Sequence, residues 1–369
     1  MNIYDISKIA GVSIATVSRV INNNPNVSEK NRVKVMAAIE ESGYTPNVFA
    51  RGLGLNTMKT IGVMCADSSD PYLAQAVYYI EQNLRKNNYD SLLSCTGYDH
   101  ETKKKCMDLL LSKRVDAIIL VGSNYVESDD RMNDYIRNAA RSVPVMLINA
   151  ALNAPNVYST LCDDFSATYE ITERFIKQGK REILYLYNSN SYSAIRKLDG
   201  FRSAMKANKL HIDEKLIHFI SSHSKSVHEV KQSIKSLCDK GITFDGVIAS
   251  DDVLAIGAIK YAKETGISVP DNLFIAGYNN FDITEYCDPT LTSVDNKLPS
   301  LCTHCVATLM SVFSNDTSIP KQTIFSAEII DISKTHKTGN FSYCQIFSFK
   351  QRGGTAYSYF VDITDYRFV

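Results

Sequence analysis

The sequence predicts an α/β protein with a small three-helix head and a larger core of two lobes, each built on a parallel sheet. Three observations predict it. Short helical patterns fill the first 45 residues, a glycine-containing segment follows, and from Ile61 onward short apolar runs alternate with amphipathic helical patterns in two rounds. At 369 residues the chain is also too long for one ordinary core.

Residues 1–45 are expected to form a compact head of three short helices. The first ends at Gly11, because glycine readily adopts the left-handed conformation of a helix end, and its apolar face consists of Ile3, Ile6, Ile9 and Ala10. Ser13 caps the second helix, whose apolar members are Val17, Val20 and Ile21. Ser28 caps the third, which ends at Gly43 after Val33, Val35, Met36 and Ile39. Such a head is typical of a DNA-binding helix-turn-helix.

Residues 46–59 are expected to form a hinge. Gly52 and Gly54 fall inside a helix-like pattern, and each glycine costs about 1 kcal/mol relative to alanine within a helix. The segment is therefore not expected to hold a stable helix on its own.

Residues 60–338 are expected to form the two lobes. Strand-like runs of the first round lie at 61–66, 91–95, 117–122 and 143–149, and those of the second at 182–187, 216–220, 246–250 and 273–278. Amphipathic helical patterns separate these runs, which is typical of parallel sheets covered by helices on both faces. The first lobe is expected at about 60–160 and 291–320, and the second at about 161–290 and 321–338.

Composition and charge narrow the class of protein. Apolar residues make up 44% and charged residues 22% of the chain, with no apolar run long enough to span a membrane and no export signal at the amino terminus. We therefore expect a cytoplasmic protein without a membrane partner. The formal net charge is zero, but residues 1–60 hold seven bases and four acids, a net charge of +3. A basic head on an acidic body favours orientation toward DNA.

Nine cysteines raise the question of disulfides or a metal. Isolated cysteines are interpreted as buried thiols, and they are Cys65, Cys95, Cys106, Cys162, Cys238, Cys287 and Cys344. Cys302 and Cys305, with His304 between them, have metal-like or redox-like spacing, but a zinc site of this kind needs a second pair. No metal and no cofactor is expected.

Polar and aromatic residues follow several of the expected strands. Lobes of this kind bind small molecules outside the carboxyl ends of their strands, and a cleft between two lobes is a common ligand site. The positions to inspect are Asp67, Asp70, Tyr72, Leu73 and Asn149 in the first lobe, and 188–193, Asp251, Tyr278 and Asn279 in the second. The sequence therefore predicts a small-molecule site between the lobes.

Several ordered motifs carry a resemblance to a known family. They are YDISKIAGVSIATVSRVINN, VSEKNRVKVMAAIEESGYTPNVFARGL, KTIGVM, DPYLA, RKLDGFRSAM, FDGVIASDDVLAIGAIKYAKETGISVPDNLFIAGYNNFD and PTLTSVDN. Over about residues 2–335 the chain resembles the lactose repressor and galactose repressor (LacI/GalR) family. The resemblance implies a periplasmic-binding-protein-like core and a homodimer that reads a pseudo-palindromic double-stranded DNA operator. It also implies a small effector, expected to be a sugar or sugar derivative, coupled to operator binding in a repressor.

The resemblance further implies that the second helix enters the major groove. Base contacts are then expected from Ile14, Ala15, Thr16 and Arg19. Arg19 can donate two hydrogen bonds to a guanine edge, and Ile14 and Ala15 can pack against thymine methyl groups. Phosphate contacts are expected from Asn2, Tyr4, Ser13, Ser18 and Asn22. For Ser13, helix capping alone is the alternative, and for Arg19 a merely solvated role.

Leu53 matches the leucine that the family's hinge helix inserts into the minor groove. An apolar wedge there separates base pairs and bends the DNA. The flanking Gly52 and Gly54 depart from the residues of many relatives and put the stability of a hinge helix in doubt. A plain linker leucine is the alternative.

For the effector, the resemblance points to Asp70, Tyr72 and Leu73 on the first lobe and to Arg196, Asp251 and Asn279 on the second. A guanidinium suits sugar hydroxyls, a phosphate or a carboxylate, and a carboxylate suits a hydroxyl donor. Capping or turn formation is the alternative for Asp251 and Asn279, and core packing is the alternative for Tyr72. Purine-like ligands remain open.

A sugar-binding receptor without a DNA role is the alternative function, and the head and the missing export signal count against it. An enzyme is not expected, because the chain has no glycine-rich phosphate loop, GxSxG elbow or HExxH motif.

Residues 339–369 fall outside the resemblance. An added oligomerisation or packing segment, a disordered tail and a reading-frame accident remain open for them.

Overall fold

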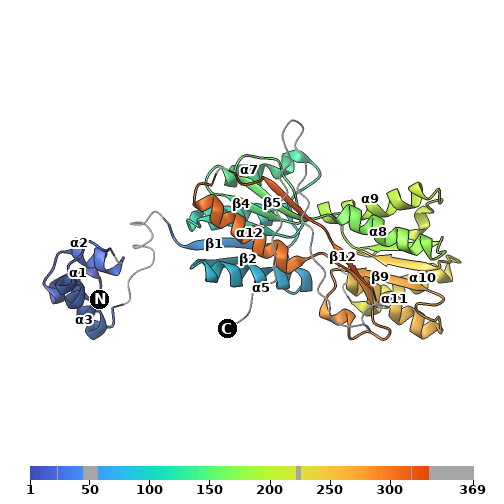
Figure 1. Cartoon of the computed structure of the whole chain (residues 1–369), viewed down its shortest axis with the longest axis horizontal. Helices are drawn as coiled ribbons and strands as arrows, with labels where there is room; N and C mark the ends of the chain where they lie inside the picture. The colour runs from blue at the N-terminus through green and yellow to red at the C-terminus, as the bar shows by residue number, and fades with distance from the viewer. Residues whose placement is uncertain (23, 45–56, 222–225, 317, 332–369) are drawn as a thin grey trace.

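The computed structural model describes residues 1–22, 24–44, 57–221, 226–316 and 318–331. The described residues form a helical head and two α/β lobes (Figure 1). Most of the predicted hinge, including Leu53, and the predicted carboxyl-terminal tail lie outside the described residues. Among the described residues, none of the helices combines the length and the apolar character needed to cross a bilayer.

The head consists of α1 (Ile3–Ala10), α2 (Ile14–Ile21) and α3 (Glu29–Ser42). Asn2 caps α1 and shares a capping box with Asp5, and Gly11 ends the helix in the left-handed conformation. The three helices share one small core formed by Ile6, Ala10, Val17, Val20, Val35 and Ala38. Three short, capped helices thus present a single buried face each, as the sequence predicts.

Ile9, which the sequence places on the apolar face of the first helix, is exposed, so that part of the prediction is wrong, and two apolar residues of the third helix are exposed as well. Ile9 is 51%, Val33 59% and Met36 53% exposed. A helix turns by about 100° per residue, so Val33 lies about 200° around α3 from the buried Val35. Ser28 stands at the N-cap of α3, as predicted, but its side chain makes no capping hydrogen bond.

The first lobe is built on a six-stranded sheet whose strand order is β11-β5-β4-β3-β1-β2. Its strands are β1 (Thr60–Cys65), β2 (Asp90–Cys95), β3 (Ala117–Val121), β4 (Val145–Ile148), β5 (Val157–Cys162) and β11 (Gln322–Phe325), and all neighbours are parallel. One face packs against α5 (Pro71–Lys86) and α12 (Leu298–Phe313). The other packs against α6 (His100–Ser112) and α7 (Asp134–Ala140), the latter preceded by the 3-10 turn η1 (Asp130–Asn133).

The second lobe repeats this arrangement with the strand order β12-β10-β9-β8-β6-β7. Its strands are β6 (Ile183–Tyr187), β7 (Ile217–Phe219), β8 (Gly246–Ala249), β9 (Phe274–Tyr278), β10 (Thr292–Asp295) and β12 (Glu328–Ile330). Only β12 runs antiparallel to its neighbour in this sheet. The helices α8 (Asp164–Lys177) and α9 (Tyr192–Ala207) cover one face, and α10 (Val227–Asp239) and α11 (Asp252–Thr265) cover the other (Figure 1). The 3-10 turns η2 (Glu214–Leu216) and η3 (Asp282–Thr284) lie in its loops.

The chain crosses between the lobes three times, and the crossings correct the predicted lobe boundaries. After β5 it enters the second lobe at α8, after β10 it returns through α12, and after β11 it passes to β12. Residues 292–295 therefore belong to the second lobe, and residues 322–325 to the first, the reverse of the prediction. The strand β5 lies at residues for which the sequence predicts no strand. The strands β5, β11 and β12 each pair with a strand that is distant in the sequence, and local sequence patterns do not reveal such pairings.

Candidate DNA-reading helix and interlobe cavity

The second helix of the head has one buried side and one free side. Val17 and Val20 lie in the head core, whereas Ala15 and Arg19 are exposed and Ile14 is 39% exposed. This division places three of the four predicted base-reading residues, Ile14, Ala15 and Arg19, on the solvent side of α2, whereas the fourth, Thr16, is half-buried. A helix anchored in this way can present its free side chains to a major groove.

The remaining predicted DNA residues of the head differ in how free they are. Ser13 caps α2 by accepting the amide of Thr16 at 3.2 Å, and its hydroxyl lies 2.9 Å from the Thr16 hydroxyl. Ser18 and Asn22 are half-buried, and Asn22 stands at the C-cap of α2. Tyr4, in the first turn of α1, is 61% exposed. Tyr4 and Ser13 are therefore more accessible than the half-buried Ser18 and Asn22.

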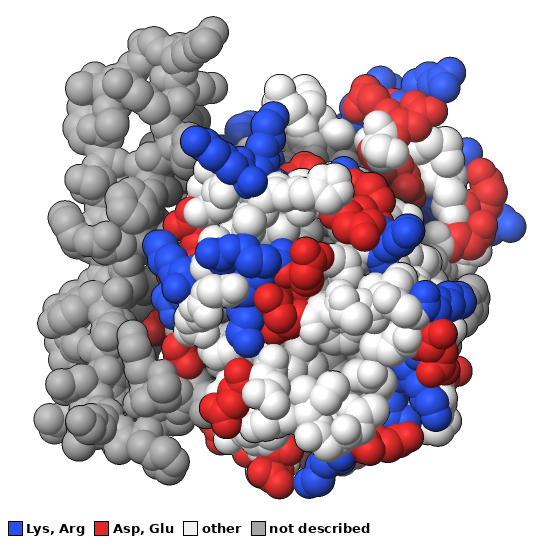
Figure 2. All heavy atoms as spheres, turned by 90° about the vertical axis from the view of Figure 1, so that its right-hand side faces the viewer, with Lys and Arg blue, Asp and Glu red and all other residues white. Residues whose placement is uncertain are grey.

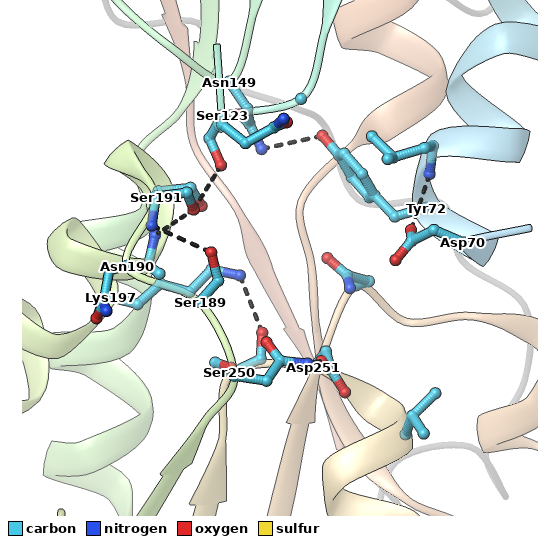
Figure 3. Close-up of a pocket in the computed structure, with 18 of the residues that line it drawn as sticks. Asp70, Tyr72, Ser123, Asn149, Ser189, Asn190, Ser191, Lys197, Ser250 and Asp251 are labelled. Carbon is cyan, nitrogen blue, oxygen red and sulfur yellow. Dashed lines mark hydrogen bonds between the residues drawn. The ribbon is translucent and has the colours of Figure 1, made fainter. Parts of the chain in front are cut away.

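A cavity of about 390 Å³ lies between the two lobes. Its walls come from the loops and helix starts that follow β1, β2, β3 and β4 in the first lobe and β6, β8 and β9 in the second (Figure 3). Phe219, at the end of β7, completes the second-lobe wall. All of these lie at the carboxyl ends of strands. The position agrees with the general rule for ligand sites in open parallel sheets.

The first lobe supplies Asp70, Tyr72, Leu73 and Asn149 to the cavity, as the sequence predicts. Asp70 caps α5 by accepting the amide of Leu73 at 3.1 Å. Asn149 donates to the Tyr72 hydroxyl at 2.9 Å, and its oxygen accepts the Cys162 amide at 3.0 Å. Burial raises the pKa of Tyr72 well above its usual value, so the phenol stays protonated and able to donate.

The second lobe supplies Asp251 and Asn279, also as predicted. Asp251 caps α11 by accepting the Leu254 amide at 2.9 Å, and its second oxygen accepts from Asn188 at 2.8 Å. Burial raises the pKa of Asp251, although these hydrogen bonds and the Lys197 charge oppose the shift. Asn279 has a φ of 100° and accepts a hydrogen bond from Asn296 at 2.9 Å. Both predicted residues thus combine a local structural task with a place on the cavity wall.

Arg196 does not line the cavity, so its predicted effector contact is wrong. It is exposed, and its guanidinium lies 5.2 Å from the ring centre of Phe165. The next residue, Lys197, lines the cavity instead. One residue along a helix is a rotation of about 100°, so only one of these two neighbours can face the cleft.

Lys197 is buried in a polar cluster at the cavity wall. Its ammonium donates to the Ser250 carbonyl at 3.0 Å and lies 3.5 Å from the ring centre of Tyr278. The buried carboxylate of Asp164 accepts from the hydroxyls of Tyr278 and Ser193, both at 2.6 Å. Burial lowers the pKa of Lys197 and raises that of Asp164, while the opposite charge of each partner counteracts both shifts.

Two hydrogen bonds join the lobes directly at the cavity. The Ser123 hydroxyl donates to the Ser191 hydroxyl at 2.8 Å, and the Tyr192 amide donates to the Ser123 carbonyl at 3.4 Å. Ser123 follows β3, and Ser191 is the N-cap of α9 (Figure 3). The relative position of the lobes is therefore tied to the loops that would surround a ligand.

Profiles of two protein families match most of the chain. The family described as periplasmic binding proteins and sugar binding domain of LacI family matches residues 58–325, and bacterial regulatory proteins of the lacI family match residues 2–47. The chain belongs to the LacI family. The predicted family and the predicted fold class are both confirmed, and the protein is a DNA-binding transcriptional regulator of this family.

Individual relatives agree with this assignment. An HTH-type transcriptional regulator of Lachnoclostridium phytofermentans is 53% identical over 341 residues, which cover 92% of this chain and all of the relative. The crystal structure of the lac repressor dimer bound to operator and the anti-inducer ONPF superposes with a TM-score of 0.80 at 24% identity, covering 90% of this chain and 98% of that one. A complex of the transcriptional regulator CelR with cellobiose gives a TM-score of 0.65 at 22% identity, with coverage of 90% and 98%. These two structures share the fold of this LacI-family protein.

Sequence reasoning missed several cavity residues of this LacI-family core. They are Tyr98, Gly122, Ser123, Asn124, Lys197 and Phe219. The strand-end rule would have found Gly122, Ser123 and Asn124, because they directly follow β3. No comparable signal marks Lys197, which lies within a helix.

Cys302 and Cys305 are both buried in α12 against the sheet of the first lobe. Burial raises the pKa of Cys305 to about 12, which keeps its thiol protonated. Within the described ranges, no group of three or more His, Cys, Asp or Glu side chains could hold a metal ion. Cys302 and Cys305 therefore act as apolar packing residues in the core of the first lobe.

Proposed function

We propose that this LacI-family regulator is a cytoplasmic homodimeric repressor whose interlobe cavity binds a neutral carbohydrate effector. The two heads read the half-sites of a pseudo-palindromic operator through α2, and the effector changes the affinity for that operator. The proposal rests on one observation: the same chain contains a helix, α2, with an exposed side and a polar cavity between two lobes.

The lining of the cavity favours a ligand with many hydroxyl groups. Hydroxyls and side-chain amides supply most of the polar groups, including Ser189, Asn190, Ser191, Asn149 and Asn279. The side-chain nitrogen of Asn124 is buried and has no hydrogen-bond partner among the described residues, so a ligand oxygen could accept from it. Sugars offer donors and acceptors in the numbers that such a wall needs.

The charges of the cavity favour a neutral ligand over a phosphorylated or carboxylated one. Asp70 and Asp251 both line the wall and would repel an anion. The cation in the lining, Lys197, already donates to the Ser250 carbonyl and lies over the Tyr278 ring. A phosphate would therefore have to draw this ammonium out of its buried cluster.

Two aromatic residues of the lining are accessible. Tyr98 is 53% and Phe219 43% exposed. A ring face can cover the apolar C–H face of a sugar while the polar wall takes its hydroxyls. CelR, which shares this fold, forms a complex with cellobiose, and this supports a carbohydrate as the ligand.

The surface charge supports the head as the DNA-contacting part. Figure 2 shows that lysine, arginine, aspartate and glutamate intermingle on the face at the second-lobe end of the molecule. A footprint for nucleic acid would be a continuous basic area. Residues 1–60, by contrast, carry a net charge of +3.

The proposal is tested by selecting a DNA site from a random library with the full-length protein and then screening ligands against the complex. A neutral mono- or disaccharide should raise the melting temperature in proportion to RT ln(1 + [L]/Kd) and change the gel-shift affinity for the selected site. Phe219→Ala should lose the thermal shift, and the control Tyr286→Ala, at a residue 84% exposed outside the lining, should keep it. Binding by sugar phosphates alone would reject the neutral ligand, and failure to select any site would reject the DNA role.

A further inference from the structure

We propose that Cys65 and Cys95 form a redox-sensitive thiol pair that a hydroperoxide converts to an intramolecular disulfide beside the interlobe cavity. The two sulfur atoms lie 3.7 Å apart. Thirty residues of sequence separate them, and the prediction that both are isolated buried thiols is wrong, because Cys95 is exposed and the fold brings it beside Cys65. The proposal concerns sulfur chemistry and does not depend on the identity of the effector.

The backbone geometry suits a disulfide. Cys65 ends β1 and Cys95 ends β2, and the two residues are register partners in neighbouring parallel strands. Neighbouring strands lie about 4.8 Å apart, within the range of about 4.4–6.8 Å between the Cα atoms of disulfides. Opposed residues of a sheet point to the same face, which brings both sulfurs to one side. Bond formation therefore needs only side-chain rotation and a small approach of the strands.

The two thiols differ in access to solvent. Cys65 is fully buried, and burial together with the neighbouring Cys95 raises its pKa to about 12. Cys95 is exposed, because β2 is the edge strand of the sheet. An oxidant in solution therefore meets Cys95 first, and the buried Cys65 lies in position to react second.

The chemistry balances with a hydroperoxide as oxidant. The Cys95 sulfur attacks the O–O bond of hydrogen peroxide, takes one oxygen as a sulfenic acid and releases the first water. The Cys65 sulfur then attacks the Cys95 sulfur, the S–O bond breaks, and the hydroxyl leaves with the Cys65 proton as the second water. Two electrons pass from the two sulfurs to the peroxide, and a dithiol reductant reverses the reaction.

The site of the pair links it to the cavity. The Cys65 carbonyl accepts from the Thr96 amide and the Ala66 carbonyl from the Gly97 amide, both at 2.9 Å. The first segment leads on to Asp70 and the second to Tyr98, and both of these residues line the cavity. A disulfide would tie the two segments together and restrict the motion of this wall.

The test treats reduced full-length protein with hydrogen peroxide, blocks the remaining thiols and maps the peptides by mass spectrometry. We expect a linked Cys65–Cys95 peptide, lighter by two hydrogen atoms, that dithiothreitol separates. Cys65→Ala should instead leave a sulfenic acid at Cys95 that dimedone traps. The matched control Cys287→Ser, at a partly buried thiol in the second lobe, should form the linked peptide like the parent.

Oxidation should also slow hydrogen exchange at the amides of residues 96–98 in the parent protein and not in Cys95→Ser. Oxidation of Cys95 to sulfinic acid without a linked peptide in the parent would overturn the proposal, and so would a disulfide that joins either residue to another cysteine or another chain. Peptide mapping of the parent protein alone shows whether the Cys65–Cys95 disulfide forms, so the test does not require Cys65→Ala to fold.

Discussion

Ser123 of the first lobe donates a hydrogen bond of 2.8 Å to Ser191 of the second, and both residues line the cavity. Because Ser191 also caps α9, the bond connects the start of a helix in one lobe to a loop of the other. A ligand that inserts between these loops must keep or replace this bond. The arrangement of the lobes and the occupancy of the cavity are in this way energetically linked.

Ser123→Ala should loosen this connection without disturbing the α9 cap. Loss of one hydrogen bond costs about 1 kcal/mol, so opening between the lobes should become roughly fivefold more frequent. Hydrogen exchange of the Tyr192 amide, which donates to the Ser123 carbonyl, should accelerate accordingly. Ser314→Ala, at the far end of α12, serves as the control. Unchanged exchange at Tyr192 would show that this bond does not hold the lobes together.

Arg19→Ala should weaken binding to the selected DNA site by roughly 10-fold or more, since a bidentate contact to guanine contributes about 1–3 kcal/mol. The head should remain folded, because Arg19 is exposed and its neighbours Val17 and Val20 carry the packing. Quantitative gel shifts at fixed salt measure the effect. Lys86→Ala, at an exposed position of α5, removes the same charge from the core and should leave affinity unchanged. Equal losses for both variants would reduce the role of Arg19 to non-specific charge.

Lys197→Met and Arg196→Ala should differ sharply in stability, although the two residues are adjacent. Lys197→Met removes a buried cation whose charge favours the ionised form of the buried Asp164, and it also removes the hydrogen bond to the Ser250 carbonyl, which as a charged hydrogen bond contributes about 1.5–3 kcal/mol. Arg196→Ala removes an exposed guanidinium above Phe165, which is worth less than about 1 kcal/mol. Urea unfolding of both variants provides the comparison. Similar losses would contradict the assignment of Lys197 as the buried member of the pair.

Asp252 should make stability depend on pH in a definite direction. It is fully buried and accepts from the Ser293 hydroxyl at 2.6 Å and the Phe281 amide at 2.9 Å. Burial raises its pKa from the ordinary 3.8 to about 7. The folded state thus holds this proton more tightly than the unfolded state, so the stabilisation is complete below about pH 4 and is lost as the pH rises to 7.

The measurement compares urea unfolding of the parent protein and Asp252→Asn between pH 4 and 7. The free energy of unfolding of the parent should decline relative to that of the variant as the pH rises, because asparagine does not titrate. Carboxylates remote from position 252 titrate equally in both proteins and cancel in the difference. A difference that is independent of pH would refute the raised pKa.

Much of the fold could be predicted because its signals are local. Capping residues such as Ser13 and Gly11 and the spacing of Val17 and Val20 locate the head helices, and apolar runs locate β1, β3, β6, β8 and β9. The strand β5 escaped prediction because it includes Ser159 and Thr160, which are polar but buried. Its burial comes from β4 and β11 on either side, and β11 lies far away in the sequence.

The candidate site was predictable to the same extent. Asp70, Tyr72, Leu73, Asp251 and Asn279 follow strands, and the ends of parallel strands meet at one edge of a sheet. The sequence by itself therefore determined the family, the head, the presence of two α/β lobes and one part of the cavity wall.

Only the tertiary structure decided between Arg196 and Lys197, brought Ser123 to Ser191, and set Cys65 beside Cys95. The first choice depends on the rotation of α9 against the second sheet, and the two pairings depend on which segments of chain become neighbours. Helix rotation and strand order are fixed by packing between distant segments, and this packing leaves no periodic trace in any one of them.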